Sequence, residues 1–90
     1  MQDKPIEQNK FERLSTRESQ VLYFLAQGFT TEQIATVLNI SINTEKIYIR
    51  GILRKLEVPT RTQAVSLYWK NYNQEGVDHE AIREAQTLSN

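Results

Sequence analysis

Serine and threonine residues divide this chain into short segments that each begin with the start signal of a helix. These residues are Ser15, Thr30, Ser41 and Thr60. Three of them, Ser15, Thr30 and Thr60, have Glu or Gln three residues later, which is the pattern of a capping box. No alternation of apolar and polar residues of useful length occurs, so the pattern predicts an all-α fold of short helices.

Each of the first two predicted helices ends at a residue that tolerates left-handed backbone. The first begins after Ser15 and ends near Gly28, and the second spans about residues 31–38 and ends at Asn39. Only residues 39–41 then remain for the turn into the third helix. The apolar residues at helical spacing in these two segments are Leu14, Val21, Leu22, Leu25, Ile34, Ala35 and Leu38.

The third predicted helix has one apolar face and one mostly basic face. It begins after Ser41 and ends by Val58, because Pro59 restricts the preceding residue and has no backbone N–H. The apolar stripe is formed by Ile49, Ile52, Leu53 and Leu56. The opposite, exposed face carries Asn43, Lys46, Ile47, Arg50 and Arg54.

The apolar residues predict a single domain with a polar segment at each end. Residues 1–13 are polar and predict a flexible arm or linker, and residues 14–72 form the domain. Its fourth helix, about 61–72, carries Ala64, Val65 and Tyr68 at core spacing, with Trp69 and Tyr72 continuing the stripe. Residues 73–90 form an acidic extension, in which Asp78 is expected to cap an extra helix through about Leu88, with Val77 and Ile82 as a hydrophobic staple.

Charge is distributed unevenly along a chain whose formal net charge is zero. Residues 41–61 hold five basic and two acidic residues, whereas residues 73–90 hold one basic and four acidic residues. The opposite local charges suggest that the acidic extension folds back on the basic helix face.

Several classes of function lack their required residues. The chain has no cysteine, one histidine (His79) and no glycine-rich phosphate loop, so we expect no metal site, no cofactor and no enzymatic activity. No apolar run approaches the length of a membrane helix or a signal peptide, so we expect a cytoplasmic, nucleoid-associated protein without membrane contact.

Two short helices joined by a tight turn, with a cationic face on the second, are the arrangement that places a helix in the major groove of DNA. Lys46 and Arg50 can donate to guanine O6 and N7, with phosphate contact as the alternative role. Ile47 can contact a thymine methyl group. The pattern therefore indicates a helix-turn-helix domain that binds double-stranded DNA.

Residues 14–65 also resemble the LuxR-type (NarL/FixJ and GerE) DNA-binding domain. The residues that carry the resemblance are Leu14, Glu18, Val21, Leu22, Gly28, Glu32, Ile34, Ala35, Leu38, Ile40, Ser41, Thr44, Lys46, Ile52, Leu53, Arg54, Lys55, Leu56, Arg61 and Ala64. The resemblance implies a four-helix domain whose third helix reads bases through Lys46, Ile47 and Arg50. It implies a dimer on DNA, and contact with RNA polymerase or another regulator. The phosphate contacts that it implies are Thr31, Asn43, Thr44, Tyr48, Arg54, Arg61 and Thr62. The dimer contact that the resemblance implies falls to Val65, Tyr68, Trp69 and Tyr72, although ordinary packing of the fourth helix explains this stripe somewhat better.

The sequence departs from the family pattern at three positions. Glu45 replaces an apolar residue, where it can accept from a cytosine amino group or repel the DNA backbone. Glu57 and Asn39 replace glycines, and Glu57 raises the question of a different helix ending. In addition, Gly51 in the middle of a helix indicates close approach of DNA or of a neighbouring helix.

Two other functions fit parts of the pattern. A helix-turn-helix that binds a partner regulator is suggested by Glu45 and by the acidic extension. A domain like region four of sigma factors also places a helix in the groove, but the segments ILRKL and PTRTQA favour the LuxR type. The sequence therefore predicts a transcriptional regulator, either free-standing or part of a longer protein.

Overall fold

The computed structural model describes residues 10–72 and 79–88, and helices are the only regular elements within them. The predicted all-α class is confirmed. The helices are α2 (Thr16–Ala26), α3 (Thr31–Leu38), α4 (Ile42–Leu56), α5 (Arg61–Lys70) and α6 (His79–Leu88). The fourth predicted helix therefore ends two residues earlier than expected.

The predicted caps begin these helices. Ser15 Oγ accepts from the Glu18 N–H at 3.1 Å, and Glu18 accepts from the Ser15 N–H at 2.9 Å. Thr30 and Gln33 form the same reciprocal pair at 3.1 and 2.9 Å. At Thr60 only half of the expected box forms: the hydroxyl accepts from the N–H of Gln63 at 3.1 Å, without the reciprocal bond from the Thr60 N–H that the first two helices show.

Three residues with left-handed backbone end the helices where the sequence suggested. Gly28 has φ +92°, Asn39 has φ 58° and Glu57 has φ 61°. Glu57 thus adopts the conformation that glycine favours at such a position. The change from glycine to glutamate leaves the type of helix ending unaltered.

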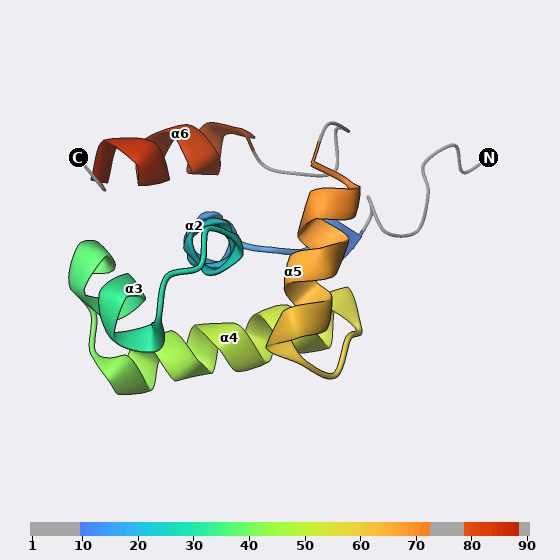
Figure 1. The fold of residues 1–90 in the computed structure, drawn as a ribbon, viewed down its shortest axis with the longest axis horizontal. Coiled ribbons are helices and arrows are strands. Elements are labelled where there is room, and N and C mark those ends of the chain that lie inside the picture. The colour runs from blue at the N-terminus through green and yellow to red at the C-terminus, as the bar shows by residue number, and fades with distance from the viewer. Residues whose placement is uncertain (1–9, 73–78, 89–90) are drawn as a thin grey trace.

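Helix α2 lies at the centre of the molecule, with α4 on one side and α6 on the other (Figure 1). Helices α3 and α5 each pack against both α2 and α4. Leu14, Leu25 and Leu53, which were expected in the core, are half-buried and pack against it. The buried core consists of Phe11, Val21, Leu22, Phe24, Ile34, Leu38, Ile49, Ile52, Leu56, Ala64, Tyr68, Ile82 and Ala85.

The folded unit begins before Leu14, which was the expected boundary. Phe11 is 4% exposed and belongs to the core. Lys10 and Arg13 lie on either side of it and form ion pairs with Glu57, at 3.4 and 3.0 Å. The expected flexible arm is therefore packed from residue 10 onward, and residues 1–9 lie outside the described part.

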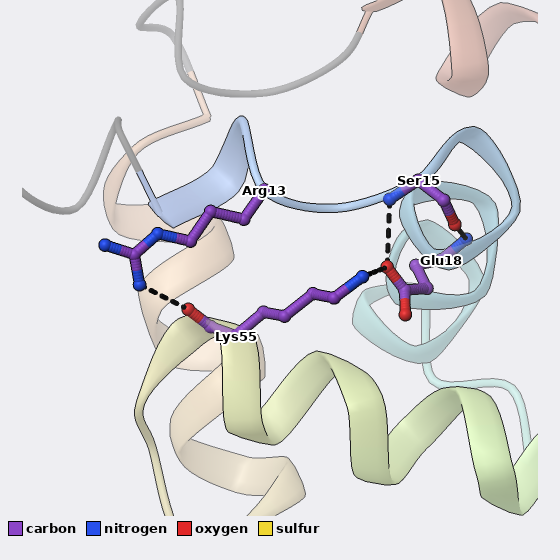
Figure 2. A network of polar contacts seen from close by, with 4 residues as sticks. All are labelled: Arg13, Ser15, Glu18 and Lys55. Atoms are coloured by element: carbon purple, nitrogen blue, oxygen red, sulfur yellow. Dashed lines mark hydrogen bonds and ion pairs between the residues drawn. The ribbon is translucent and has the colours of Figure 1, made fainter.

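A polar network ties the start of α2 to the last turns of α4 (Figure 2). Lys55 Nζ donates to Glu18 Oε1 at 2.8 Å, the same oxygen that accepts from the Ser15 backbone. Arg13 donates to the backbone carbonyl of Lys55 at 3.4 Å. The capping residue of one helix is thus also an ion-pair partner of another.

Helix α6 confirms the predicted extra helix but not the predicted fold-back. Its residues Ile82 and Ala85 belong to the core, Ala81 is also buried, and Gln20 of α2 donates to Glu84 at 2.9 Å. In Figure 1, α6 lies on the side of α2 away from α4. The described part of the acidic extension therefore does not cover the basic face of α4. The expected cap at Asp78 and the staple residue Val77 lie outside the described residues.

Candidate nucleic-acid interface

Helices α3 and α4 are joined by the tight turn that the sequence predicts. Asn39 ends α3 in the left-handed conformation, and the N–H of Ile40 donates back to the carbonyl of Ala35 at 2.9 Å. Ser41 then caps α4 by accepting from the N–H of Thr44 at 3.0 Å. Because both ends of the turn are closed by hydrogen bonds, the relative orientation of the two helices is fixed locally.

The outer face of α4 is exposed and mostly basic. Asn43, Lys46, Ile47, Arg50 and Arg54 are all exposed, as predicted. Ile47 is 55% exposed although it is a large apolar side chain. In Figure 1, α4 lies at one edge of the molecule, with α2 and α6 both on the same side of it. The face therefore combines cations with an apolar contact in an arrangement open to a macromolecule.

Ile42 belongs to the same region and was not predicted from the sequence. It is the first residue of α4, is 42% exposed and lies one turn before Lys46. An isoleucine at the start of a helix is usually part of the core, so the sequence alone did not mark Ile42 as a surface residue. With Ile47 it gives this surface two apolar side chains.

The candidate phosphate ligands fall into two groups. Asn43, Arg54 and Thr62 are exposed and unobstructed. Thr44 and Tyr48 are half-buried: the Thr44 hydroxyl oxygen accepts from Ser41 at 2.9 Å, and Tyr48 packs against the core.

Arg61 and Thr31 form an internal contact between two helix starts. Arg61 Nη1, from the first residue of α5, donates to Thr31 Oγ1, on the first residue of α3, at 3.2 Å. Both residues are half-buried. The structure thus brings together two residues that the sequence assigned separately to phosphate contact.

Glu45 does not occupy the exposed position expected for it. Its side chain is 0% exposed, so it can neither accept from a cytosine amino group nor face a phosphate. Within the described residues neither carboxylate oxygen has a hydrogen-bond partner. Burial raises the pKa of Glu45, while the positive charges of Arg61 and Lys46 act in the opposite direction.

The stripe assigned to dimerisation or packing divides between core and surface. Tyr68 is buried, and Tyr72 is half-buried against the core, so both serve mainly in packing. Val65, expected at a core position, is half-buried but outside the core cluster. Trp69 is 47% exposed, with its indole N–H donating to the carbonyl of Ala26 at 3.3 Å. Val65 and Trp69 therefore form the outer side of α5.

Two structural features, a cluster of metal-ligating side chains and a membrane-spanning helix, are absent from the described part of the chain. Among residues 10–72 and 79–88, no group of three or more His, Cys, Asp or Glu is arranged to hold a metal ion. None of the described helices has the length and apolar character needed to cross a membrane.

The sequence of the chain is similar to known bacterial regulatory proteins. Residues 12–68 match the model of the luxR family of bacterial regulatory proteins. The nitrate/nitrite response regulator protein NarP of Escherichia coli is 50% identical over 62 residues, which are 69% of this chain and 29% of NarP. The response regulator protein VraR of Staphylococcus aureus is 44% identical over 55 residues, 61% of this chain and 26% of VraR. No solved structure matches the chain.

The chain spans less than a third of the length of these curated relatives. The family match nevertheless covers more than half of the chain itself. It includes α2 to α4 and most of α5. The chain therefore belongs to the luxR family of bacterial regulatory proteins, and residues 12–68 are its helix-turn-helix DNA-binding domain.

Proposed function

We propose that this protein is a sequence-specific transcriptional regulator that inserts α4 into the major groove and binds DNA as a homodimer. The observation that carries the proposal is the exposed face of α4, where Lys46, Ile47 and Arg50 stand together. Glu45 directly precedes Lys46 in sequence, but its carboxylate is buried. The exposed face of α4 therefore keeps its positive charge. The major groove is wide enough to admit an α-helix, and the side chains of such a face can then contact the base edges.

Base reading is assigned to the centre of this face. Arg50 and Lys46 donate to guanine O6 and N7, and Ile47 contacts a thymine methyl group. Ile42, exposed one turn before Lys46, adds a second apolar contact near the start of the helix. Each good bidentate contact is expected to discriminate by roughly 1–3 kcal/mol against the wrong base.

Phosphate binding is assigned to the edges of the same surface. Arg54, Asn43 and Thr62 are exposed, Thr31, Thr44 and Arg61 are half-buried in the first turns of helices, and Tyr48 is half-buried in the second turn of α4. Such contacts set the position of the protein on the duplex without reading its sequence. They also make affinity dependent on salt.

Dimerisation is assigned to the outer side of α5, where Val65 and Trp69 lie one turn apart. A dimer of this kind would bind half-sites about one helical turn apart, or a multiple of it. From the DNA it would contact RNA polymerase or another regulator, in the cytoplasm of a bacterial cell.

The alternative of a protein-interaction module has less support. It depended on Glu45 and on the acidic extension as binding determinants. Glu45 is fully buried, and α6 packs on α2, away from the exposed face of α4. A cationic face whose neighbouring carboxylate is buried favours DNA over an ordinary protein partner.

In-vitro selection of DNA, with anisotropy titrations of the selected duplex over a range of salt concentrations, tests the proposal. We expect enrichment of a repeated motif, and affinity for it well above that for unrelated DNA at each salt concentration. Selection that yields no motif, with equal affinity for all duplexes, would contradict sequence-specific regulation.

A further inference from the structure

The first turns of three helices contribute side chains to one partly buried polar cluster. Thr31 is the first residue of α3, Glu45 lies in the first turn of α4, and Arg61 is the first residue of α5. Arg61 Nη1 donates to Thr31 Oγ1 at 3.2 Å. The Thr31 hydroxyl lies close enough to the Glu45 carboxylate to act on its pKa, in the lowering direction, without reaching the geometry of an ordinary hydrogen bond.

Glu45 is the anomalous member of this cluster. It is 0% exposed, and both of its oxygens lack a hydrogen-bond partner within the described residues. A buried, unpartnered carboxylate is costly and is not what packing alone would select. The positive charge of Arg61 favours the ionised form of Glu45, although the two side chains do not form a close ion pair.

Arg61 can interact with two different anions. One is the internal carboxylate of Glu45, and the other is a DNA phosphate at the edge of the α4 surface. Charges attract more strongly in a site from which water is excluded, so the internal carboxylate competes effectively with a solvated phosphate. The hydrogen bond to Thr31 directs the guanidinium of Arg61 toward the first turn of α3.

We infer that Glu45 is a buried restraint on Arg61: when charged it holds Arg61 in the internal cluster, and when neutral it releases Arg61 to the DNA backbone. This inference rests on the proposed DNA-binding function and assigns Glu45 a positioning role. DNA affinity is then regulated from inside the domain by the protonation of one residue that never contacts DNA.

The charged groups that face Glu45 set the direction of the effect. They are Arg61 on α5, Lys46 on α4 and Glu32 on α3. Burial raises the pKa of Glu45 above its ordinary value, so protonation occurs at a milder pH than for an exposed glutamate. Acidification therefore neutralises Glu45 and removes its attraction for Arg61, so affinity for DNA increases.

The test measures binding of the selected duplex by anisotropy, from about pH 5 to about pH 8 and over a range of salt concentrations. The proteins are the wild type, Glu45→Gln, Arg61→Ala and the double variant. Glu45→Gln keeps the shape of the side chain and removes its charge. We expect it to tighten binding at neutral pH by roughly three- to tenfold, and to steepen the salt dependence by about one phosphate contact. We also expect it to abolish the gain in affinity on acidification.

The double variant distinguishes a restraint on Arg61 from a general loss of negative charge. In the Arg61→Ala background, Glu45→Gln should leave the affinity almost unchanged. Glu32→Gln is the matched control, because Glu32 is an exposed carboxylate near the same cluster. Its effect should be small and the same with or without Arg61. Glu45→Val, which has no polar atoms to leave unsatisfied, replaces Glu45→Gln if circular dichroism shows that the glutamine variant is unfolded.

Weaker binding by a folded Glu45→Gln protein, or an equal gain in the Arg61→Ala background, would overturn the inference while leaving DNA binding intact. A wild-type chain that binds no DNA above background would overturn the proposed function and this inference with it.

Discussion

Gly51 of α4 lies directly against the carboxylate of Glu18 in α2. A Cβ placed on Gly51 would be 2.8 Å from Glu18 Oε2. The other oxygen of Glu18 accepts from the Ser15 backbone and from Lys55, so the carboxylate is held at this position. Of the two neighbours that the sequence allowed for this glycine, DNA and another helix, the structure identifies the helix.

We predict that Gly51→Ala lowers the free energy of unfolding by about 1 kcal/mol, because the added methyl group displaces an anchored carboxylate. In a Glu18→Ala background the same substitution should instead stabilise the protein by about 0.5–1 kcal/mol, since only the higher helix propensity of alanine remains. Urea unfolding of the four proteins measures both effects. If Gly51→Ala stabilises the wild-type protein, the Glu18 carboxylate moves aside at little energetic cost, and this prediction is wrong.

Glu18 and Glu45 should have opposite effects on the pH dependence of stability. Burial acts to raise the pKa of Glu18, but hydrogen bonds from Lys55 and Ser15, with the charge of Lys55, outweigh it, and the net pKa lies below the ordinary 4.5. The stability that Glu18 contributes is therefore present above pH 4.5 and is lost as pH falls through the lowered pKa.

For Glu45 the net pKa is raised, chiefly by burial, from the same ordinary value of 4.5. Its contribution is then fully present below pH 4.5 and is lost as pH rises through the raised pKa. Urea unfolding between about pH 4 and about pH 8 should show that Glu45→Gln removes the decline of stability above pH 4.5. Glu18→Gln should leave that decline in place, and a decline that survives Glu45→Gln would argue against a buried, ionisable Glu45.

Tyr68 offers a test of the packing between α5 and the core. Its side chain is buried, and its hydroxyl has no hydrogen-bond partner among the residues that the structure describes. Tyr68→Phe should therefore stabilise the domain by about 1 kcal/mol, because it removes a buried polar group without changing the ring. The increase in Tm is measured by calorimetry, and half-buried Tyr72→Phe, which should show no gain, is the control. A loss of stability in Tyr68→Phe would mean that the hydroxyl is hydrogen-bonded in solution.

The features that sequence predicted best are those decided locally. Thr30 and Gln33 bond to each other's backbone, and Asn39 adopts the left-handed conformation that asparagine tolerates, so the bounds of α3 follow from adjacent residues. Burial of Glu45 could not be predicted in this way. It results from the positions of α3 and α5, and a glutamate in a first helical turn ordinarily faces solvent.

The same limit applies at the N-terminal side of the domain. Phe11 stands in a polar segment, and its burial depends on a core built from residues far along the chain. Likewise, the ion pairs of Lys10 and Arg13 are with Glu57, more than forty residues away. Contacts at such sequence distances leave no local periodic signal.

The central claim, that α4 reads bases through its exposed face, depends most directly on the difference between Arg50 and Arg54. Both are exposed arginines of α4, so each serves as the control for the other. The measurement is the affinity of each alanine variant for the selected duplex and for a set of its single-base substitutions. Arg50→Ala should lose roughly 1–3 kcal/mol and its preference at one base pair, whereas Arg54→Ala should weaken binding to all duplexes alike and reduce the salt slope by about one. Identical behaviour of the two variants across the set would contradict the claim.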